Sequence, residues 1–427
     1  MSALSLSPPL LVDQEAWELA AHLLVAPPTG TLSDNVTSLD PLLEKLLLLN
    51  RQTREQPFPP FPLADLLHFG IPLMERQWSA QEREQVRQAA NQWRRELVGD
   101  TVSYVVNRNL NPSNHCILHC GFCAYRRSEG EEGAFRLERS KLREKAAEAQ
   151  ALGATELCLQ AGLDPDATTN GRHLDHAVGL LVDLKEAAPR LHVHGFSPQE
   201  LLFLSQRDNL PLQEVIQTLR QAGLDSVPGT AAEVLCTRVR QLICPEKLCA
   251  RTWVTVIRQV HQAGLPTTST LMAGHVETPR EQLAHLCTLA ALQHQAWLEG
   301  NTGFTEFILL PFVGASAPAP LRARVGRDQP DPEAMLLLTA QARLLLGPWF
   351  HHHQSSWVKL TLPLAAEALD WGCDDLGGTL MEEHISTMAG AAGGTRQSVE
   401  ALEEAARSRH RPVRQRTTLY GAPAASC

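Results

Sequence analysis

Three cysteines, Cys116, Cys120 and Cys123, lie close together in the stretch NPSNHCILHCGFCAYRR at 111–127. Cysteines in such a group can bind a metal, form a disulfide, or simply fill buried space. A disulfide would leave one of the three unpaired, and ten cysteines in 427 residues is far below the density of a disulfide scaffold. Structural zinc takes four ligands, usually in two pairs, and no second C-x2-C is present, although His115 or His119 could complete a site.

A 4Fe–4S cluster is the remaining alternative, and it normally takes four thiolates. Three thiolates leave one iron open to a substrate or cofactor, as catalytic metal sites generally do. The C-x3-C-x2-C spacing resembles the signature of the radical S-adenosylmethionine (radical SAM) superfamily, and Phe122 matches the aromatic residue usual there. The resemblance implies one 4Fe–4S cluster held by Cys116, Cys120 and Cys123, with S-adenosylmethionine on the open iron.

Short apolar segments alternate with capped helices from residue 100 onward. Strands are expected at 101–107, 155–162, 191–196, 224–229, 266–274, 304–312 and 351–360, with a weaker one near 371–376. This alternation is typical of βαβ units and a parallel sheet. It predicts an α/β fold with a TIM-type (βα) barrel, complete or partly open, and an N-terminal helical extension. A doubly wound sheet is the alternative, but no G-x-G-x-x-G follows any of these strands.

Three regions are expected along the chain. Residues 1–98 form a helical region, residues 99–330 the radical SAM core barrel, and residues 331–427 the part that completes the barrel and forms the tail. The clearest helix of the first region begins with the capping-box pair Ser79 and Glu82. The cysteines follow the first strand, at the end of a barrel where active sites are built.

Composition excludes several classes of function. The net charge is −9 and the only dense basic run is short, so we expect no nucleic-acid partner. No stretch of about 18 apolar residues is present, so no membrane span is expected. The N-terminus carries early acidic residues and lacks a basic segment, unlike a signal peptide. Together with the low cysteine content, these features predict a cytoplasmic protein.

Further stretches narrow the resemblance. They include LCLQAGLDPD, GLDSVPGTAAEVL, ICPEK, TGFTEFILLPF, SSWVKL, DDLGGTLMEEHIS and RQRTTLYG, and together they cover roughly residues 60–421. These stretches resemble the second-subunit family of FO synthase, the enzyme that makes a deazaflavin. The radical SAM enzymes of the futalosine route to menaquinone (dehypoxanthine futalosine cyclase and aminofutalosine synthase) share much of the pattern and are the alternative.

The resemblance implies a reaction and its partners. A deoxyadenosyl radical would take hydrogen from L-tyrosine, and the released 4-hydroxybenzyl group would add to 5-amino-6-(D-ribitylamino)uracil. The first subunit of FO synthase would close the ring, because this chain carries no second cluster motif. A donor such as ferredoxin or flavodoxin would supply the electron.

The resemblance also points to cofactor-binding residues. Gln160 and Gly162 end the second strand, where relatives seat the methionine part of S-adenosylmethionine, although small residues after a strand are also ordinary turn formers. Asp164 stands where many relatives have histidine. Glu233 is expected to bind the nucleoside hydroxyls, with a solvated carboxylate at a helix start as the alternative.

Four further residues are expected to bind substrate, and all of them lie on or beside barrel strands: His194, His275, Glu306 and Gln354. Histidines outside active sites usually serve as structural groups, which is the alternative for the first two. An acid on a barrel strand is costly to bury without a partner, which favours a functional role for Glu306.

Overall fold

The computed structural model describes residues 39–56 and 61–423. The N-terminal stretch considered above for a targeting signal lies outside these residues. The described part of the chain forms nine strands, and every strand pairing is parallel. The strands are β1 (Val102–Val105), β2 (Asn107–Leu110), β3 (Glu156–Leu159), β4 (His192–Gly195), β5 (Thr267–Ala273), β6 (Phe304–Pro311), β7 (His353–Ser355), β8 (Asp375–Gly378) and β9 (Val413–Arg416).

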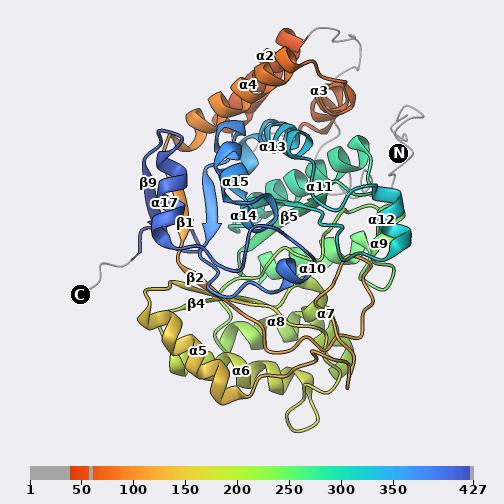
Figure 1. The fold of residues 1–427 in the computed structure, drawn as a ribbon, viewed down its shortest axis with the longest axis vertical. Coiled ribbons are helices and arrows are strands. Elements are labelled where there is room, and N and C mark those ends of the chain that lie inside the picture. The colour runs from red at the N-terminus through yellow and green to blue at the C-terminus, as the bar shows by residue number, and fades with distance from the viewer. Residues whose placement is uncertain (1–38, 57–60, 424–427) are drawn as a thin grey trace.

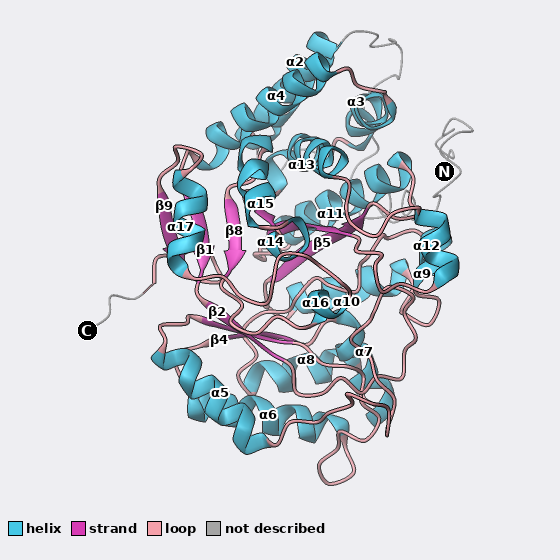
Figure 2. Ribbon diagram, in the orientation of Figure 1, coloured by secondary structure: helices cyan, strands magenta, loops and turns pink. Residues whose placement is uncertain are grey.

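The strands form two sheets, with the orders β2-β3-β4 and β5-β6-β7-β8-β1-β9. On one side the sheets are continuous, because β1 runs directly into β2 through Val106, whose carbonyl accepts from the Thr155 N–H. On the other side, single parallel bridges join His194 to Ser226 and Val227 to Thr267. The strands therefore enclose an α/β barrel that is joined on one side by single bridges, which confirms the predicted TIM-type fold in its partly open form (Figure 2).

The longer helices lie outside the strands (Figure 1), whereas the short α14 (Trp357–Leu360) and α16 (Ile385–Met388) contribute residues that line the cavity described below. The remaining helices are α2 (Leu39–Glu55), α3 (Leu63–Glu75), α4 (Ala80–Val98), α5 (Arg139–Ala151), α6 (His173–Ala187), α7 (Pro198–Asp208), α8 (Leu212–Gln221), α9 (Thr237–Ile243), α10 (Ala250–Gln262), α11 (Pro279–Leu298), α12 (Ala319–Val325), α13 (Pro332–Leu346), α15 (Leu362–Ala368) and α17 (Val399–Arg407). Short 3-10 turns, η2 (Gly347–Trp349) and η3 (Leu369–Trp371), link two of these helices to the strands that follow. No helix in the described ranges combines the length and apolar character that crossing a membrane requires.

The N-terminal helices pack on the barrel helices rather than standing apart from them. Helix α4 contacts α13, and α3 contacts α11. The three N-terminal helices α2, α3 and α4 therefore cover one side of the outer layer (Figure 1). The expected capping box at the start of α4 is present: the Glu82 N–H donates to Ser79 Oγ, and the Ser79 N–H donates to the Glu82 carboxylate. The buried face of α4, with Val86, Ala90 and Trp93, follows the 3.6-residue period.

Several expected strands are wrong in extent. Segment 224–229 is not a strand but two isolated bridges, because Pro228 has no N–H to donate and Gly229 packs directly against the Thr268 backbone. The expected strand at 351–360 ends at Ser355, and the chain turns into α14. The eighth strand begins only at Asp375. Strand β9, at the C-terminal end of the described chain, was not expected at all.

Candidate active site

A cavity of about 400 Å³ opens inside the barrel. Nine of the ten residues that the sequence predicted for the site line it: Cys116, Cys120, Cys123, Gln160, Gly162, His194, Glu233, Glu306 and Gln354. They come from the ends and inner faces of β3, β4, β6 and β7 and from the loops that follow β2 and segment 224–229. Residues distant in sequence thus converge on a single space.

The three cysteines lie on the loop after β2, which backbone hydrogen bonds hold in place. The Gly121 N–H donates to the Ile243 carbonyl at 2.7 Å, and the Cys123 N–H donates to the Cys120 carbonyl at 3.1 Å. The cysteines are half-buried and form no disulfide. Burial raises the pKa of the Cys120 thiol to about 12 and also raises that of Cys116.

These cysteines fit an iron–sulfur cluster by their donor chemistry. Bound iron holds a thiol in its thiolate form, so it would overcome the effect of burial on the pKa. Three sulfur donors facing one cavity leave space on the side where a further ligand enters. No group of three or more His, Cys, Asp or Glu within the described ranges converges as closely as a single metal ion requires.

Gly162 packs directly on the cysteine loop. A Cβ at this position would lie 2.0 Å from the His115 carbonyl oxygen and 3.0 Å from Cys116 Cβ. The end of β3 and the cysteine loop can therefore approach each other only with glycine here. Asp164, two residues on, anchors the same loop by accepting from the Arg136 guanidinium and from the Ser113 hydroxyl.

A second polar group beside the cysteines is the pair of Glu233 and Lys247. The Lys247 ammonium lies 2.5 Å from Glu233 Oε1, and it also lies over the Phe122 ring at 5.1 Å from the ring centroid. Burial would raise the pKa of Glu233, but Lys247 offsets it and lowers that pKa. Burial would likewise lower the pKa of Lys247, but Glu233 and Cys120 raise it. Both groups are therefore charged beside the cysteine loop.

Gln160, just after β3, and His194, on β4, both line the cavity. The His194 ring is buried, and its Nδ1 lies 2.7 Å from the Ser226 hydroxyl. Burial lowers the pKa of His194 to about 4, so the imidazole is neutral at neutral pH. The Gln160 backbone is fixed by β2, since its N–H donates to the Leu110 carbonyl.

The end of the cavity away from the cysteines is acidic. Arg416 of β9 donates to both oxygens of Asp375, at 2.5 and 3.0 Å, and reaches Glu306 Oε2 at 3.2 Å. The Tyr420 hydroxyl donates to the same oxygen of Glu306. Burial raises the pKa of Glu306 to about 7, against the opposing effect of Arg416. Glu306 is thus only partly neutralised by its neighbours.

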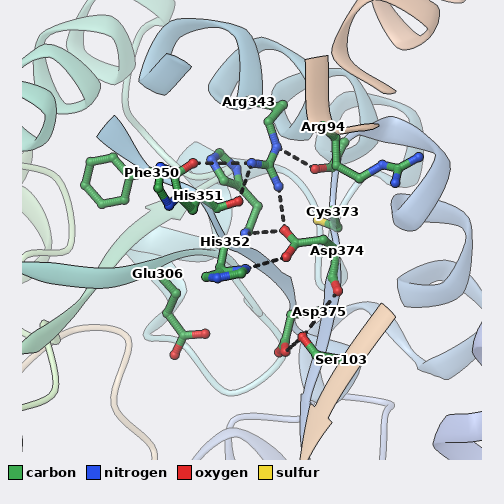
Figure 3. A network of polar contacts seen from close by, with 12 residues as sticks. Arg94, Ser103, Glu306, Arg343, Phe350, His351, His352, Cys373, Asp374 and Asp375 are labelled. Carbon is green, nitrogen blue, oxygen red and sulfur yellow. Dashed lines mark hydrogen bonds and ion pairs between the residues drawn. The ribbon is translucent and has the colours of Figure 1, made fainter. Parts of the chain in front are cut away.

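A network of buried charged groups lies next to this end of the cavity (Figure 3). The Arg343 guanidinium donates to Asp374 at 2.6 Å, and His352 Nδ1 lies 2.7 Å from the other oxygen of Asp374. The neighbouring Asp375 accepts from the Ser103 hydroxyl at 2.5 Å. Every charged group here has a partner, which is the condition for burying charge at low cost.

The structure does not bring His275 to the cavity. Its Nε2 lies 3.0 Å from the Met272 carbonyl oxygen, its Nδ1 lies 3.1 Å from the Glu277 carboxylate, and its ring packs edge-on against Phe312. Only Nε2 is hydrogen-bonded, and Nδ1 is buried beside the Glu277 carboxylate without forming a hydrogen bond. These contacts match the structural role that was the alternative for this histidine.

Sequence reasoning missed several residues that line the cavity. They include the charged residues Glu156, Lys247 and Lys359. Glu156 and Lys359 stood in segments expected to be apolar strands, where a single charge was a usable signal. Lys247 lies in ICPEK, a stretch that the resemblance included but that spacing alone did not connect to the cysteines.

Comparison with known proteins agrees with this fold. Residues 110–287 match the family model described as "Radical SAM superfamily". Methylornithine synthase has a similar fold, with a TM-score of 0.63 and 16% identity over 88% of this chain and 97% of that one. HydG, a maturase of the FeFe-hydrogenase, has a TM-score of 0.62 at 13% identity over 95% of this chain and 80% of its own. Members of this superfamily bind a 4Fe–4S cluster and S-adenosylmethionine.

Curated relatives are far more similar. The 5-amino-6-(D-ribitylamino)uracil–L-tyrosine 4-hydroxyphenyl transferase of Synechococcus elongatus is 58% identical over 340 residues, which are 79% of this chain and 88% of that one. The protein of the same name from Synechocystis is 55% identical over 338 residues, which are 79% of this chain and 86% of that one. By this similarity, the chain belongs to the family of radical SAM 5-amino-6-(D-ribitylamino)uracil–L-tyrosine 4-hydroxyphenyl transferases.

Proposed function

We propose that this protein cleaves L-tyrosine and transfers its 4-hydroxybenzyl group to 5-amino-6-(D-ribitylamino)uracil, in the synthesis of the deazaflavin FO. The observation that carries the proposal is the 58% identity to a relative named for these two substrates, over 88% of that relative's length. The barrel cavity supports it, because three free cysteines and a row of polar side chains face one space.

The cysteines and their neighbours would hold the cofactors. Cys116, Cys120 and Cys123 would bind a 4Fe–4S cluster, which together with S-adenosylmethionine supplies a deoxyadenosyl radical when bound. Glu233 and Lys247 are charged beside the cysteine loop, so they suit the amino, carboxylate or hydroxyl groups of a nucleoside amino acid. Gly162 allows the cysteine loop to pack directly against the end of β3.

The remaining lining residues would bind the two substrates. Gln160 and the neutral His194 line the same cavity, where they can donate and accept hydrogen bonds. Glu306 and Gln354, on the adjacent strands β6 and β7, offer a carboxyl and an amide farther from the cysteines.

We also propose the wider setting of the reaction. The chain divides into residues 1–98 as an N-terminal helical region, of which the structure describes 39–56 and 61–98, residues 99–330 as the radical SAM core barrel, and residues 331–427 as the part that completes the barrel and forms the tail. The product passes to the first subunit of FO synthase for ring closure. A ferredoxin or flavodoxin supplies the electron, and the protein works in the cytoplasm.

Anaerobic reconstitution with iron and sulfide, followed by incubation with S-adenosylmethionine and both substrates, tests this function. We expect deoxyadenosine and a 4-hydroxybenzyl adduct of the ribitylaminouracil, detected by mass spectrometry. The Cys120→Ser protein, in the same incubation, should form neither product. Deoxyadenosine without an adduct would reject the proposed substrates and favour the futalosine-route alternative.

A further inference from the structure

The acidic end of the cavity is built partly by the last described segment of the chain. Strand β9 pairs with one edge of β1, whose other edge pairs with β8, and this pairing places Arg416 inside the barrel. A turn follows, in which the Tyr420 N–H donates to the Thr417 carbonyl at 3.0 Å. The turn brings Tyr420 back over the barrel. Its ring stacks on His352 with centroids 3.5 Å apart and lies 4.0 Å from the Arg416 guanidinium carbon.

Arg416 is shared unequally between two acids. Asp375 takes two of its contacts, and it also accepts from the Ser103 hydroxyl and the Gly377 N–H. Glu306 takes one longer contact from Arg416 and one from Tyr420. The charge of Asp375 is therefore well compensated, while that of Glu306 remains available to a ligand.

Glu306 has one oxygen to spare. Both of its contacts end at Oε2, and Oε1 accepts no hydrogen bond from any described residue. Nor does Oε1 belong to the fully buried polar atoms that lack a partner, so it reaches open space. Gln354, which lines the same cavity from β7, likewise makes no side-chain hydrogen bond within the described ranges. A free carboxylate oxygen and a free amide therefore stand on neighbouring strands.

The position of this pair selects the part of the ligand that it contacts. Glu306 is the third residue of β6, near the start of the strand, whereas the cysteines follow the end of β2. In a parallel barrel these positions lie at opposite ends of the interior. The carbon that receives the hydroxybenzyl group must stay beside tyrosine and the cofactors. The substituent of the acceptor ring therefore extends toward Glu306 and Gln354.

We propose that Glu306 and Gln354 bind the polyhydroxylated side chain of the acceptor substrate, and that Arg416 and Tyr420 are positioning residues that orient Glu306 for this contact. The inference rests on the proposed function. A carboxylate oxygen accepts from hydroxyls and an amide can both donate and accept, which suits a chain of adjacent hydroxyl groups. The C-terminal segment thereby becomes part of the substrate site.

Ionised Glu306 is the form that accepts from two hydroxyls, so binding depends on pH. The groups that face Glu306 are Arg416 and Tyr420 from the C-terminal segment, Asp375 from β8, and Glu156 and Cys158 from β3. Burial raises the pKa of Glu306 to about 7, while the hydrogen bond from Tyr420 lowers it. Loss of the Tyr420 hydroxyl therefore raises the pKa, and binding then requires a higher pH.

The test uses Tyr420→Phe in the reconstituted full-length protein, with ribitylaminouracil binding measured by calorimetry from pH 6 to pH 8.5. We expect wild-type binding to tighten as the pH rises through about 7, and the variant to bind about threefold to tenfold more weakly at pH 7. Its midpoint should move upward. Glu306→Gln should bind weakly with no midpoint in this range. The matched control is Tyr104→Phe, because Tyr104 also donates to a carboxylate, Glu403, but lies outside the cavity.

A second ligand distinguishes contacts to the ribityl side chain from contacts to the uracil ring. We expect 5,6-diaminouracil, which lacks the ribityl chain, to bind equally to wild type and Tyr420→Phe with no dependence on Glu306. The same pH midpoint in wild type and Tyr420→Phe would overturn the positioning role. A shift of equal size for diaminouracil would overturn the assignment to the polyol. Wild type that binds no ribitylaminouracil and forms no adduct would instead reject the proposed function itself.

Discussion

The contact between Gly162 and the cysteine loop gives a prediction whose size follows from the structure. In Gly162→Ala the new Cβ would lie 2.0 Å from the His115 carbonyl oxygen and 2.7 Å from its carbon. These are backbone atoms of the loop, so no side chain can turn away to make room. Overpacking costs about 1–3 kcal/mol, and contact with backbone places this change near 3 kcal/mol.

That cost sets two measurable effects. At about 2.1 cal/mol/K per residue, a chain of 427 residues unfolds with about 0.9 kcal/mol/K, so 3 kcal/mol lowers Tm by about 3 °C. If the loop moves instead, the strain is relieved but Cys116, whose Cβ would lie 3.0 Å from the new methyl, is displaced. We then expect reconstituted protein to hold less than half of the wild-type iron and sulfide. The assay is differential scanning fluorimetry together with iron and sulfide analysis.

Gly179→Ala is the control for this prediction. Gly179 lies within α6, and the atoms nearest to a Cβ there, at 3.0 Å, belong to the Arg139 guanidinium, the far end of a long side chain rather than backbone. Alanine favours the helix by up to about 1 kcal/mol over glycine, so this variant should keep its iron and be no less stable. The reasoning would be refuted if Gly162→Ala retained both the wild-type Tm, within 1 °C, and the full iron content.

Two further predictions concern buried charge. Lys247→Met leaves the buried Glu233 without its cation, which we expect to cost about 3–5 kcal/mol. In wild type, Lys247 lowers the pKa of Glu233, so the stability that the ionised pair contributes is lost as the pH falls. In the variant, burial raises the pKa of Glu233, so the free energy of unfolding should increase as the pH falls from 8 to 5. Urea titrations at several pH values measure this, and a variant with the wild-type pH trend would contradict it. The neutral His194 contributes stability that is full above about pH 6.5 and is lost as the pH falls toward 4, at most about 3 kcal/mol. His194→Gln should flatten this part of the stability profile, and an unchanged slope would argue against it.

The sequence by itself determined the class of fold and the chemistry of its most distinctive loop. Alternating apolar strands and capped helices predict a parallel α/β barrel because each period is a local property of the chain. The capping box of Ser79 and Glu82 is equally local, and it is present. The spacing of Cys116, Cys120 and Cys123 needed no tertiary information either, because a short loop brings its own residues together.

Only the tertiary structure decided which polar side chains share the cavity. His194 and His275 both follow a pattern of histidine at a strand end, yet only His194 faces the interior, because His275 is turned onto the Met272 carbonyl. The role of Gly162 depends on how closely β3 approaches the cysteine loop, a distance between segments that spacing does not encode.

The acidic end shows the same limit most clearly. Arg416 lies 110 residues after Glu306, and no local pattern relates the two. They meet because β9 adds to the edge of β1, a pairing that depends on backbone hydrogen bonds between distant segments. Local periodicity thus fixes which elements form, whereas the closure of the barrel fixes which charges must neutralise one another inside it.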